Sequence, residues 1–242
     1  MDRPLCLIIG AGEGLGCSLA KKFSLMGFAL GLVSRSESGS RAALKVSRDV
    51  AGEKNAEYFK ADASDPPSIE SACLEAEERF GNPGVLLYNV SGYYARKSPL
   101  ELDYSELELN YREEVLGALA AAKAIIPGMI LRQAGTVIYS SATAAFRGSS
   151  TNPLYSLGKF GLRSLSQSLA KAYSKKGVHV AHVRLDCVLD TPSIKKSYPD
   201  FDREKMSSTD DVAETYWWIH QQPRTAWSNE VELRPFTEEW TF

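Results

Sequence analysis

The sequence predicts an α/β fold in which a doubly wound parallel sheet of about seven strands forms a single domain over residues 1–242. Three observations support this prediction. Short apolar runs alternate with amphipathic helical patterns from one end of the chain to the other. The apolar runs are continuous, as in parallel strands that helices cover on both faces. No low-complexity linker or internal repeat divides the chain, and its length suits one domain with a large core.

The predicted strands are short runs rich in branched and aromatic residues. In chain order they cover residues 4–10, 28–34, 56–62, 85–90, 135–141, 178–185 and 229–236. A predicted helix separates each strand from the next. Because strand, helix and strand in succession form a parallel pair, this order predicts a Rossmann-like sheet.

The predicted helices cover residues 14–27, 37–51, 65–81, 103–132, 153–176 and 210–222. In the first, Leu15, Leu19 and Phe23 recur at four-residue spacing and give the helix one apolar face. The third begins with two prolines and ends at Gly81, which is the usual asymmetry of helix ends.

Composition and charge exclude several classes of function. A net charge of −2, with 44% apolar and 24% charged residues, gives no basic excess for nucleic acid or an anionic membrane. The longest apolar stretch, residues 115–131, contains Lys123 and Pro127, so no membrane span is expected. The cysteines lack CxxC spacing and the histidines form no metal-ligand grouping. We therefore expect reduced thiols, no metal site and a cytoplasmic location.

A glycine-rich turn, GAGEGLG, joins the first predicted strand to the first helix. Glycines permit a tight turn and let a pyrophosphate approach the backbone and the N-terminal amides of the helix. The alternative is that they only form a turn, but their place in a βαβ unit favours dinucleotide binding. The predicted cofactor contacts here are Gly10, Gly12, Gly14, Leu15 and Gly16.

A tyrosine and a lysine, Tyr155 and Lys159, are spaced to share one face near the start of the fifth helix. A free phenol titrates at about pH 10, and a neighbouring ammonium lowers its pKa. Such a pair can exchange a proton with a carbonyl or an alcohol without a metal. The alternative is an ordinary polar helix edge. The glycine turn and a serine pair that ends the preceding strand argue against it.

In these motifs and in their order, the chain resembles the short-chain dehydrogenase/reductase family over nearly its whole length. Gly10, Gly14 and Gly16 match the family's GxxxGxG turn, and Tyr155 and Lys159 match its YxxxK motif. The resemblance implies an oxidoreductase that interconverts a carbonyl (ketone or aldehyde) and an alcohol by hydride transfer with a nicotinamide cofactor. The implied substrate is a small molecule.

The resemblance also implies catalytic roles. Tyr155 is then the proton donor, and Lys159 binds the cofactor ribose and lowers the pKa of the tyrosine. A serine polarises the substrate oxygen. Aligning the strand ends selects Ser141, with Ser140 in reserve, whereas counting back from the tyrosine reaches Ala142 and requires one extra loop residue.

The end of the second strand selects the cofactor in this family. NAD-dependent members carry an acid there, but this chain has Ser34 followed by Arg35, and an arginine can pair with the 2′-phosphate of NADP. We expect NADP, with NAD as the alternative, because Glu13 stands where many NADP-dependent members have a basic residue.

Three further matches complete the implied cofactor site. Asp62 corresponds to the aspartate that meets the adenine amino group, although a turn or N-cap role suits it equally. Asn89 corresponds to the asparagine that braces the sheet beside the cofactor. Thr191 corresponds to the threonine that contacts the nicotinamide half.

Some positions depart from the family pattern. Glu114 stands where the family has an asparagine that holds a relay water, and Asn110 lies one helical turn earlier. Asp186 and Cys187 replace the usual PG pair, and residues 88–91 read YNVS instead of NNAG. These departures leave open a catalytically impaired NADP(H)-binding protein with a regulatory role.

Two further expectations concern the oligomeric state and an alternative class of enzyme. The helix over residues 114–129 is apolar around much of its surface, and equivalent helices pair in related proteins, so we expect a homodimer or homotetramer. A methyltransferase that uses S-adenosylmethionine could share the sheet, but it would have no use for the tyrosine–lysine pair.

Overall fold

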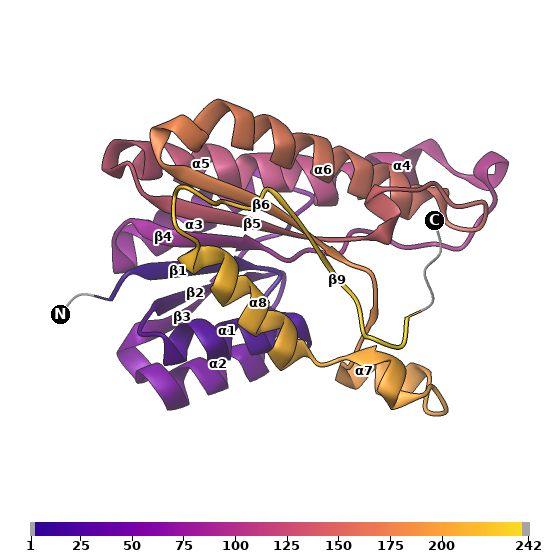
Figure 1. Cartoon of the computed structure of the whole chain (residues 1–242), viewed down its shortest axis with the longest axis horizontal. Coiled ribbons are helices and arrows are strands. Elements are labelled where there is room, and N and C mark those ends of the chain that lie inside the picture. Colours follow the sequence, from indigo (N-terminus) through magenta and orange to yellow (C-terminus); the bar gives the residue numbers. More distant parts are fainter. Residues whose placement is uncertain (1–2, 239–242) are drawn as a thin grey trace.

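The computed structural model describes residues 3–238 and confirms the predicted fold class. Seven strands form one parallel sheet in the order β3-β2-β1-β4-β5-β6-β9 (Figure 1). Each corresponds to one predicted strand. Their bounds are β1 (Leu5–Ile9), β2 (Ala29–Ser34), β3 (Ala56–Lys60), β4 (Pro83–Tyr88), β5 (Gly135–Ala142), β6 (Val178–Leu185) and β9 (Glu230–Leu233).

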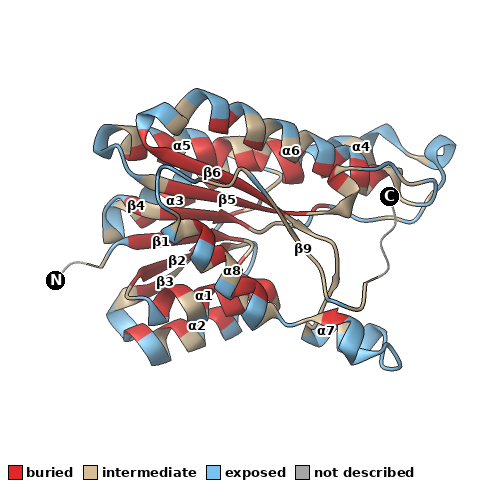
Figure 2. Cartoon of the chain, viewed as in Figure 1, coloured by how far each residue is buried: buried red, intermediate tan, exposed pale blue. Residues whose placement is uncertain are grey.

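Helices cover both faces of this sheet, which explains why its strands are continuously apolar. One layer holds α1 (Leu15–Leu25), α2 (Glu37–Ala51) and α8 (Thr209–Gln221). The other holds α3 (Pro66–Phe80), α5 (Gly117–Arg132) and α6 (Pro153–Tyr173). Figure 2 shows the buried strands between helices whose outer faces are exposed.

Alternate residues of each strand supply two separate hydrophobic cores. In β1, Cys6 and Ile8 pack with α1 and α8, whereas Leu5, Leu7 and Ile9 pack with α3 and α5. Successive side chains of a strand point to opposite faces, so both faces must be apolar. The two cores hold the central strands rigidly, and the site lies at the ends of these strands.

The strand order reverses between β1 and β4. From β1 the chain extends the sheet through β2 and β3 in one direction, and from β4 it extends the other way. In open parallel sheets, ligands bind outside the carboxyl ends of the strands at this switch point. The glycine turn follows β1, and Asn89 follows β4, so both lie there.

The helix predicted over residues 103–132 is divided in the structure. It consists of α4 (Tyr104–Tyr111), a π-helical turn (Arg112–Leu116) and α5. The whole segment is long and apolar enough to cross a membrane, but 56% of its most apolar window is buried inside the protein, as in a core helix. Periodicity alone did not reveal the π turn, a feature that often occurs at functional sites.

A small second sheet was also not predicted. Strand β7 (Val188–Leu189) pairs in parallel with β8 (Met206–Ser207), and α7 (Pro192–Ser197) lies between them in the chain. Figure 1 shows α7 at the carboxyl end of the main sheet, set apart from the two helical layers.

Candidate active site

The glycine turn has the tight backbone that the sequence predicted. Gly10 has a φ of +86°, and a Cβ atom there would overlap the carbonyl group of Asn89. A Cβ on Gly16 would lie 2.7 Å from the carbonyl oxygen of Gly10. The side-chain amide of Asn89 donates to that same oxygen at 3.0 Å, so it ties the end of β4 to the turn.

Two adjoining hollows meet at this turn, with volumes of about 600 and 320 Å³. The larger extends toward α6, and the smaller extends toward the end of β2. Both are lined by Gly10, Gly12, Asn89, Val90 and Ser91. No neighbouring atom lies within 4 Å of a Cβ built on Gly12, so the backbone is open to a ligand there. Two half-sites joined at a glycine turn fit a dinucleotide.

The smaller hollow contains the residues predicted to bind the adenosine half. Ser34, Arg35 and Asp62 all line it. The carboxylate of Asp62 accepts hydrogen bonds from the N–H and hydroxyl of Ser64, at 2.9 and 2.8 Å, so it also shapes a turn. The turn role and the proposed adenine contact can therefore coexist, as the sequence suggested.

Glu113, which sequence reasoning missed, lies in the same hollow. Its Oε1 atom is 3.9 Å from Nη1 of Arg35, whose side chain is 74% exposed. Burial raises the pKa of the Glu113 carboxyl, and a hydrogen bond from the Tyr93 N–H lowers it. The only sequence signal for this residue was its place beside Glu114, just before the apolar part of the helix begins at Val115.

Helix α6 presents Tyr155 and Lys159 to the larger hollow, as predicted. Its first residue, Pro153, occupies a helix position that needs no N–H donor. The lysine Nζ lies 5.6 Å from the centroid of the tyrosine ring. Lys159 is buried, and its ammonium donates to the carbonyl oxygens of Val90 at 3.2 Å and Ser140 at 3.4 Å.

The lysine also forms an ion pair that places an acid beside the tyrosine. Its Nζ lies 2.8 Å from Oε2 of Glu114, and both side chains are almost completely buried. Burial alone lowers the pKa of Lys159, but Glu114 and Tyr155 raise it, and the net direction is upward. The lysine is therefore held as a cation in the absence of any ligand.

The electrostatics of Tyr155 correct one expectation. Burial raises the pKa of this phenol, Lys159 lowers it, and Glu114 raises it again. The lysine acts in the predicted direction, but the net pKa lies above the ordinary value because burial and the carboxylate outweigh the ammonium. A hydrogen bond with the Ser91 side chain also lowers the pKa of Tyr155, but by less than these effects change it.

The structure separates the two candidate serines because adjacent strand residues face opposite sides of the sheet. Ser140 also lines the larger hollow, but its hydroxyl lies 2.8 Å from the hydroxyl of Tyr216 on α8 and is paired there. The Ser141 hydroxyl is buried at the wall of the larger hollow and has no hydrogen-bond partner among the described residues. Such a hydroxyl can bind a ligand oxygen, which favours Ser141.

The residues that replace the family's PG pair are anchored in the wall of the larger hollow. Asp186 accepts a hydrogen bond from the Thr143 hydroxyl and pairs with Nη2 of Arg234 at 2.8 Å. Cys187 also lines the hollow, and burial raises the pKa of its thiol. The acid at this position is thus compensated by a cation.

Thr191 lies against the glycine turn instead of deep in the larger hollow. A Cβ on Gly14 would lie 2.9 Å from its Cγ2 atom. Its hydroxyl accepts a hydrogen bond from the Ile194 N–H at 3.3 Å and so caps α7. The predicted contact with the nicotinamide half stays a prediction.

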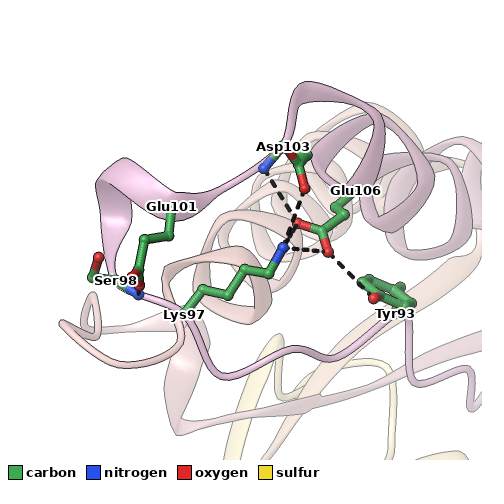
Figure 3. A network of polar contacts seen from close by, with 6 residues as sticks. All are labelled: Tyr93, Lys97, Ser98, Glu101, Asp103 and Glu106. Carbon is green, nitrogen blue, oxygen red and sulfur yellow. Dashed lines mark hydrogen bonds and ion pairs between the residues drawn. The ribbon is translucent and has the colours of Figure 1, made fainter.

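A polar network holds the loop between β4 and α4 in place (Figure 3). The Nζ of Lys97 lies 2.8 Å from both carboxylate oxygens of Glu106 and 3.2 Å from Oδ2 of Asp103. The hydroxyl of Tyr93 donates to Glu106 at 3.3 Å. This loop carries Ser91 to Pro99 across one side of the site and reaches α4 as an ordered wall.

The ordered loop brings a second aromatic residue to the proposed proton donor. Tyr94 packs edge-on against Tyr155, with ring centroids 5.7 Å apart. Asn110, one helical turn before Glu114, donates to the Tyr93 carbonyl oxygen at 2.9 Å and so supports this loop. Sequence reasoning missed Tyr94, because nothing in the local pattern distinguishes it from a surface residue.

A doubly wound sheet, a glycine turn at its switch point and a tyrosine–lysine pair in the adjoining hollow define a dinucleotide-dependent oxidoreductase. The chain belongs to the short-chain dehydrogenase family, whose sequence profile matches residues 5–201. This membership excludes the methyltransferase alternative and confirms the family resemblance of the sequence motifs.

Similar proteins agree with this assignment. An uncharacterised oxidoreductase of Staphylococcus saprophyticus is 28% identical over 237 residues, which cover 97% of this chain and 98% of the relative. A 3-oxoacyl-[acyl-carrier-protein] reductase of Bos taurus is 25% identical over 206 residues, with coverage of 82% and 84%. A metagenomic short-chain oxidoreductase, solved in complex with NADP, has the same fold with a TM-score of 0.82, 22% identity and coverage of 97% and 98%.

Proposed function

We propose that this protein is an NADP-dependent oxidoreductase that interconverts a ketone or aldehyde and the corresponding alcohol by hydride transfer. One observation carries the proposal: Tyr155, Ser141 and Lys159 all line the hollow that begins at the glycine turn. Two hydroxyl groups at one hollow, with a fixed cation beside them, suit carbonyl reduction. Family membership supports the same reaction class.

Each proposed catalytic group has a separate task. NADPH, when bound, supplies the hydride that reduces the carbonyl carbon. Ser141 donates its unpaired hydroxyl to the substrate oxygen and polarises the carbonyl. Tyr155 transfers its proton to that oxygen as negative charge develops. Lys159 binds the ribose and keeps a positive charge beside the phenol, 5.6 Å from the ring centroid.

The choice of NADP rests on Arg35. Its exposed guanidinium lies at the smaller hollow, where it can pair with a 2′-phosphate. The NADP bound to the metagenomic relative is consistent with this assignment. NAD is the alternative. Glu113, which faces the arginine, is a second feature that favours it, besides Glu13 in the glycine turn.

We expect Arg35→Ala to weaken NADPH binding about tenfold or more and to leave NADH binding nearly unchanged. The reason is that a charge-assisted contact contributes about 1.5 to 3 kcal/mol, and only NADPH carries the 2′-phosphate. Fluorescence titration of both cofactors measures the difference. Equal weakening of the two cofactors would remove the basis for NADP.

We expect Ser141→Ala to lower turnover about a hundredfold, because a preorganised donor to the reacting oxygen is lost. Ser140→Ala is the matched control, since it removes a neighbouring hydroxyl that contacts Tyr216 in the core. It should cost about 1 kcal/mol in unfolding free energy and have little effect on turnover. The opposite pattern would make Ser140 the catalytic serine.

The test of the overall proposal is NADPH consumption across a panel of ketones and aldehydes. Turnover on at least one substrate is the expected result. Tight NADPH binding without turnover on any of them would favour the NADP(H)-binding regulatory protein, which the comparisons do not support. A cytoplasmic location and a homodimer or homotetramer remain predictions, and sedimentation analysis would count the subunits.

A further inference from the structure

The π-helical turn brings two consecutive glutamates into the cofactor site. Glu113 reaches the smaller hollow, whereas Glu114 turns toward α6 and meets Lys159. Each also accepts a hydrogen bond from the loop after β4: Glu114 from the Gly92 N–H at 2.8 Å, and Glu113 from the Tyr93 N–H at 2.5 Å. The two carboxylates therefore share a loop-anchoring role, and only Glu114 pairs with the lysine.

Glycines beside Glu114 leave room for a side chain longer than the asparagine that is usual at this position in the family. A Cβ on Gly92 would lie 2.8 Å from Cγ of Glu114, and a Cβ on Gly158 would lie 2.9 Å from the same atom. Gly158 stands directly before Lys159 on α6. Glycine on both sides allows Glu114 to be fully buried at 0% exposure and still reach the ammonium.

The charges around Tyr155 come from three elements. Lys159 faces it from α6, Glu114 from the π turn, and Tyr94 from the loop after β4. The buried His182 on β6 is a further neighbour of Lys159, and burial lowers the pKa of this histidine to about 4, so it is neutral. The lysine charge is thus opposed by one carboxylate, which partly offsets its effect on the phenol.

We propose that Glu114 is a positioning residue that opposes the charge of Lys159 and thereby keeps Tyr155 in its protonated form, which is the form that donates the proton in carbonyl reduction. The inference rests on the proposed function, in which Tyr155 exchanges the proton. In reduction, hydride adds to the carbonyl carbon and the phenol proton to its oxygen, and solvent then returns a proton to the phenolate. Alcohol oxidation instead needs the phenolate at the start, which this site disfavours.

The sign of the effect follows from the charges. Burial raises the pKa of Tyr155, Lys159 lowers it and Glu114 raises it. Removal of the carboxylate leaves the ammonium unopposed, so the phenol should lose its proton at lower pH. A charge at this range shifts a pKa by about 1 to 3 units.

The experiment measures the ionisation of Tyr155 without turnover. Protein labelled with ¹³C at the tyrosine ζ carbon is titrated by NMR from about pH 7 to pH 10.5 with NADPH bound, a range that brackets an ordinary phenol. Tyr155→Phe identifies the signal of Tyr155 among the eleven tyrosines. In the wild type the signal should keep its protonated position beyond about pH 9, and in Glu114→Gln the midpoint should fall by about one unit or more.

Glu113→Gln is the matched control. It lies on the same π turn and anchors the same loop, but it does not contact Lys159. Glu113→Gln should shift the midpoint of the Tyr155 titration only slightly, even if it changes cofactor binding. A purely structural role of Glu114 would predict equal effects for the two variants.

Several outcomes would overturn the inference. These are a wild-type midpoint below about pH 8, an unchanged or raised midpoint in Glu114→Gln, and an equal shift in Glu113→Gln. A wild-type midpoint below about pH 8 would overturn the inference by itself, even where Glu114→Gln does not fold. Because no step needs turnover, a protein that reduces no carbonyl would refute the proposed function and still report the ionisation of Tyr155.

Discussion

Replacement of Tyr155 by phenylalanine is expected to lower carbonyl turnover by about a hundredfold to ten-thousandfold, which is the range for loss of a positioned general acid. The variant keeps the ring that packs against Tyr94 and deletes only the hydroxyl. The melting temperature and NADPH affinity should therefore stay close to wild type. Steady-state kinetics on an active substrate from the carbonyl panel, with a parallel NADPH titration, measure both effects.

The interpretation of this variant depends on what else changes with it. If kcat falls while cofactor affinity is retained, the phenol acts in the chemical step. Full turnover of Tyr155→Phe would show that the tyrosine hydroxyl takes no part in the reaction, and the catalytic proposal would then fail. Ser140→Ala, which removes a hydroxyl that is paired with Tyr216, provides the comparison for an effect on packing.

The second large effect is expected for Lys159→Met, which should lower the free energy of unfolding by about 3 to 5 kcal/mol as well as the rate. Breaking a buried ion pair leaves the remaining charge without compensation, and Glu114 is completely buried. Three interactions of the ammonium, with Glu114, Val90 and Ser140, disappear together. Urea unfolding measures the loss, and NADPH titration measures the expected decrease in affinity.

The double variant Lys159→Met/Glu114→Gln separates charge from packing. With both charges removed, no buried ion is left unpaired, so much of the lost stability should return. Activity should not return, because the lysine is still absent. A single variant as stable as the wild type would show that the pair has little effect on the fold, in disagreement with its burial.

Local patterns account for most of the fold that could be predicted. Continuous apolar runs marked the seven strands of the main sheet, and the glycine turn after β1 marked the nucleotide end of the sheet. The π turn at Arg112–Leu116 and the small β7–β8 sheet were not predicted. A π turn shifts the helix by one residue without changing its apolar composition, and two-residue strands have no periodicity to detect.

The candidate site, like the fold, could be predicted from the sequence only in part. Tyr155 and Lys159 were predictable because both lie on one helix, where a four-residue spacing fixes their relation. The choice between Ser140 and Ser141 depended on which face of β5 meets α8. The net pKa direction of Tyr155 depended on its burial and on a carboxylate from another element. Sequence spacing does not report either of these contacts.

The sequence by itself determined that this protein has a doubly wound sheet, a dinucleotide turn and a tyrosine–lysine pair. Each of these follows from the spacing of residues that are close together in the sequence. Only the tertiary structure decided that Glu114 pairs with Lys159 and that Glu113 faces Arg35. Both pairs join segments far apart in the chain, and the burial that strengthens the Lys159–Glu114 pair arises only on folding.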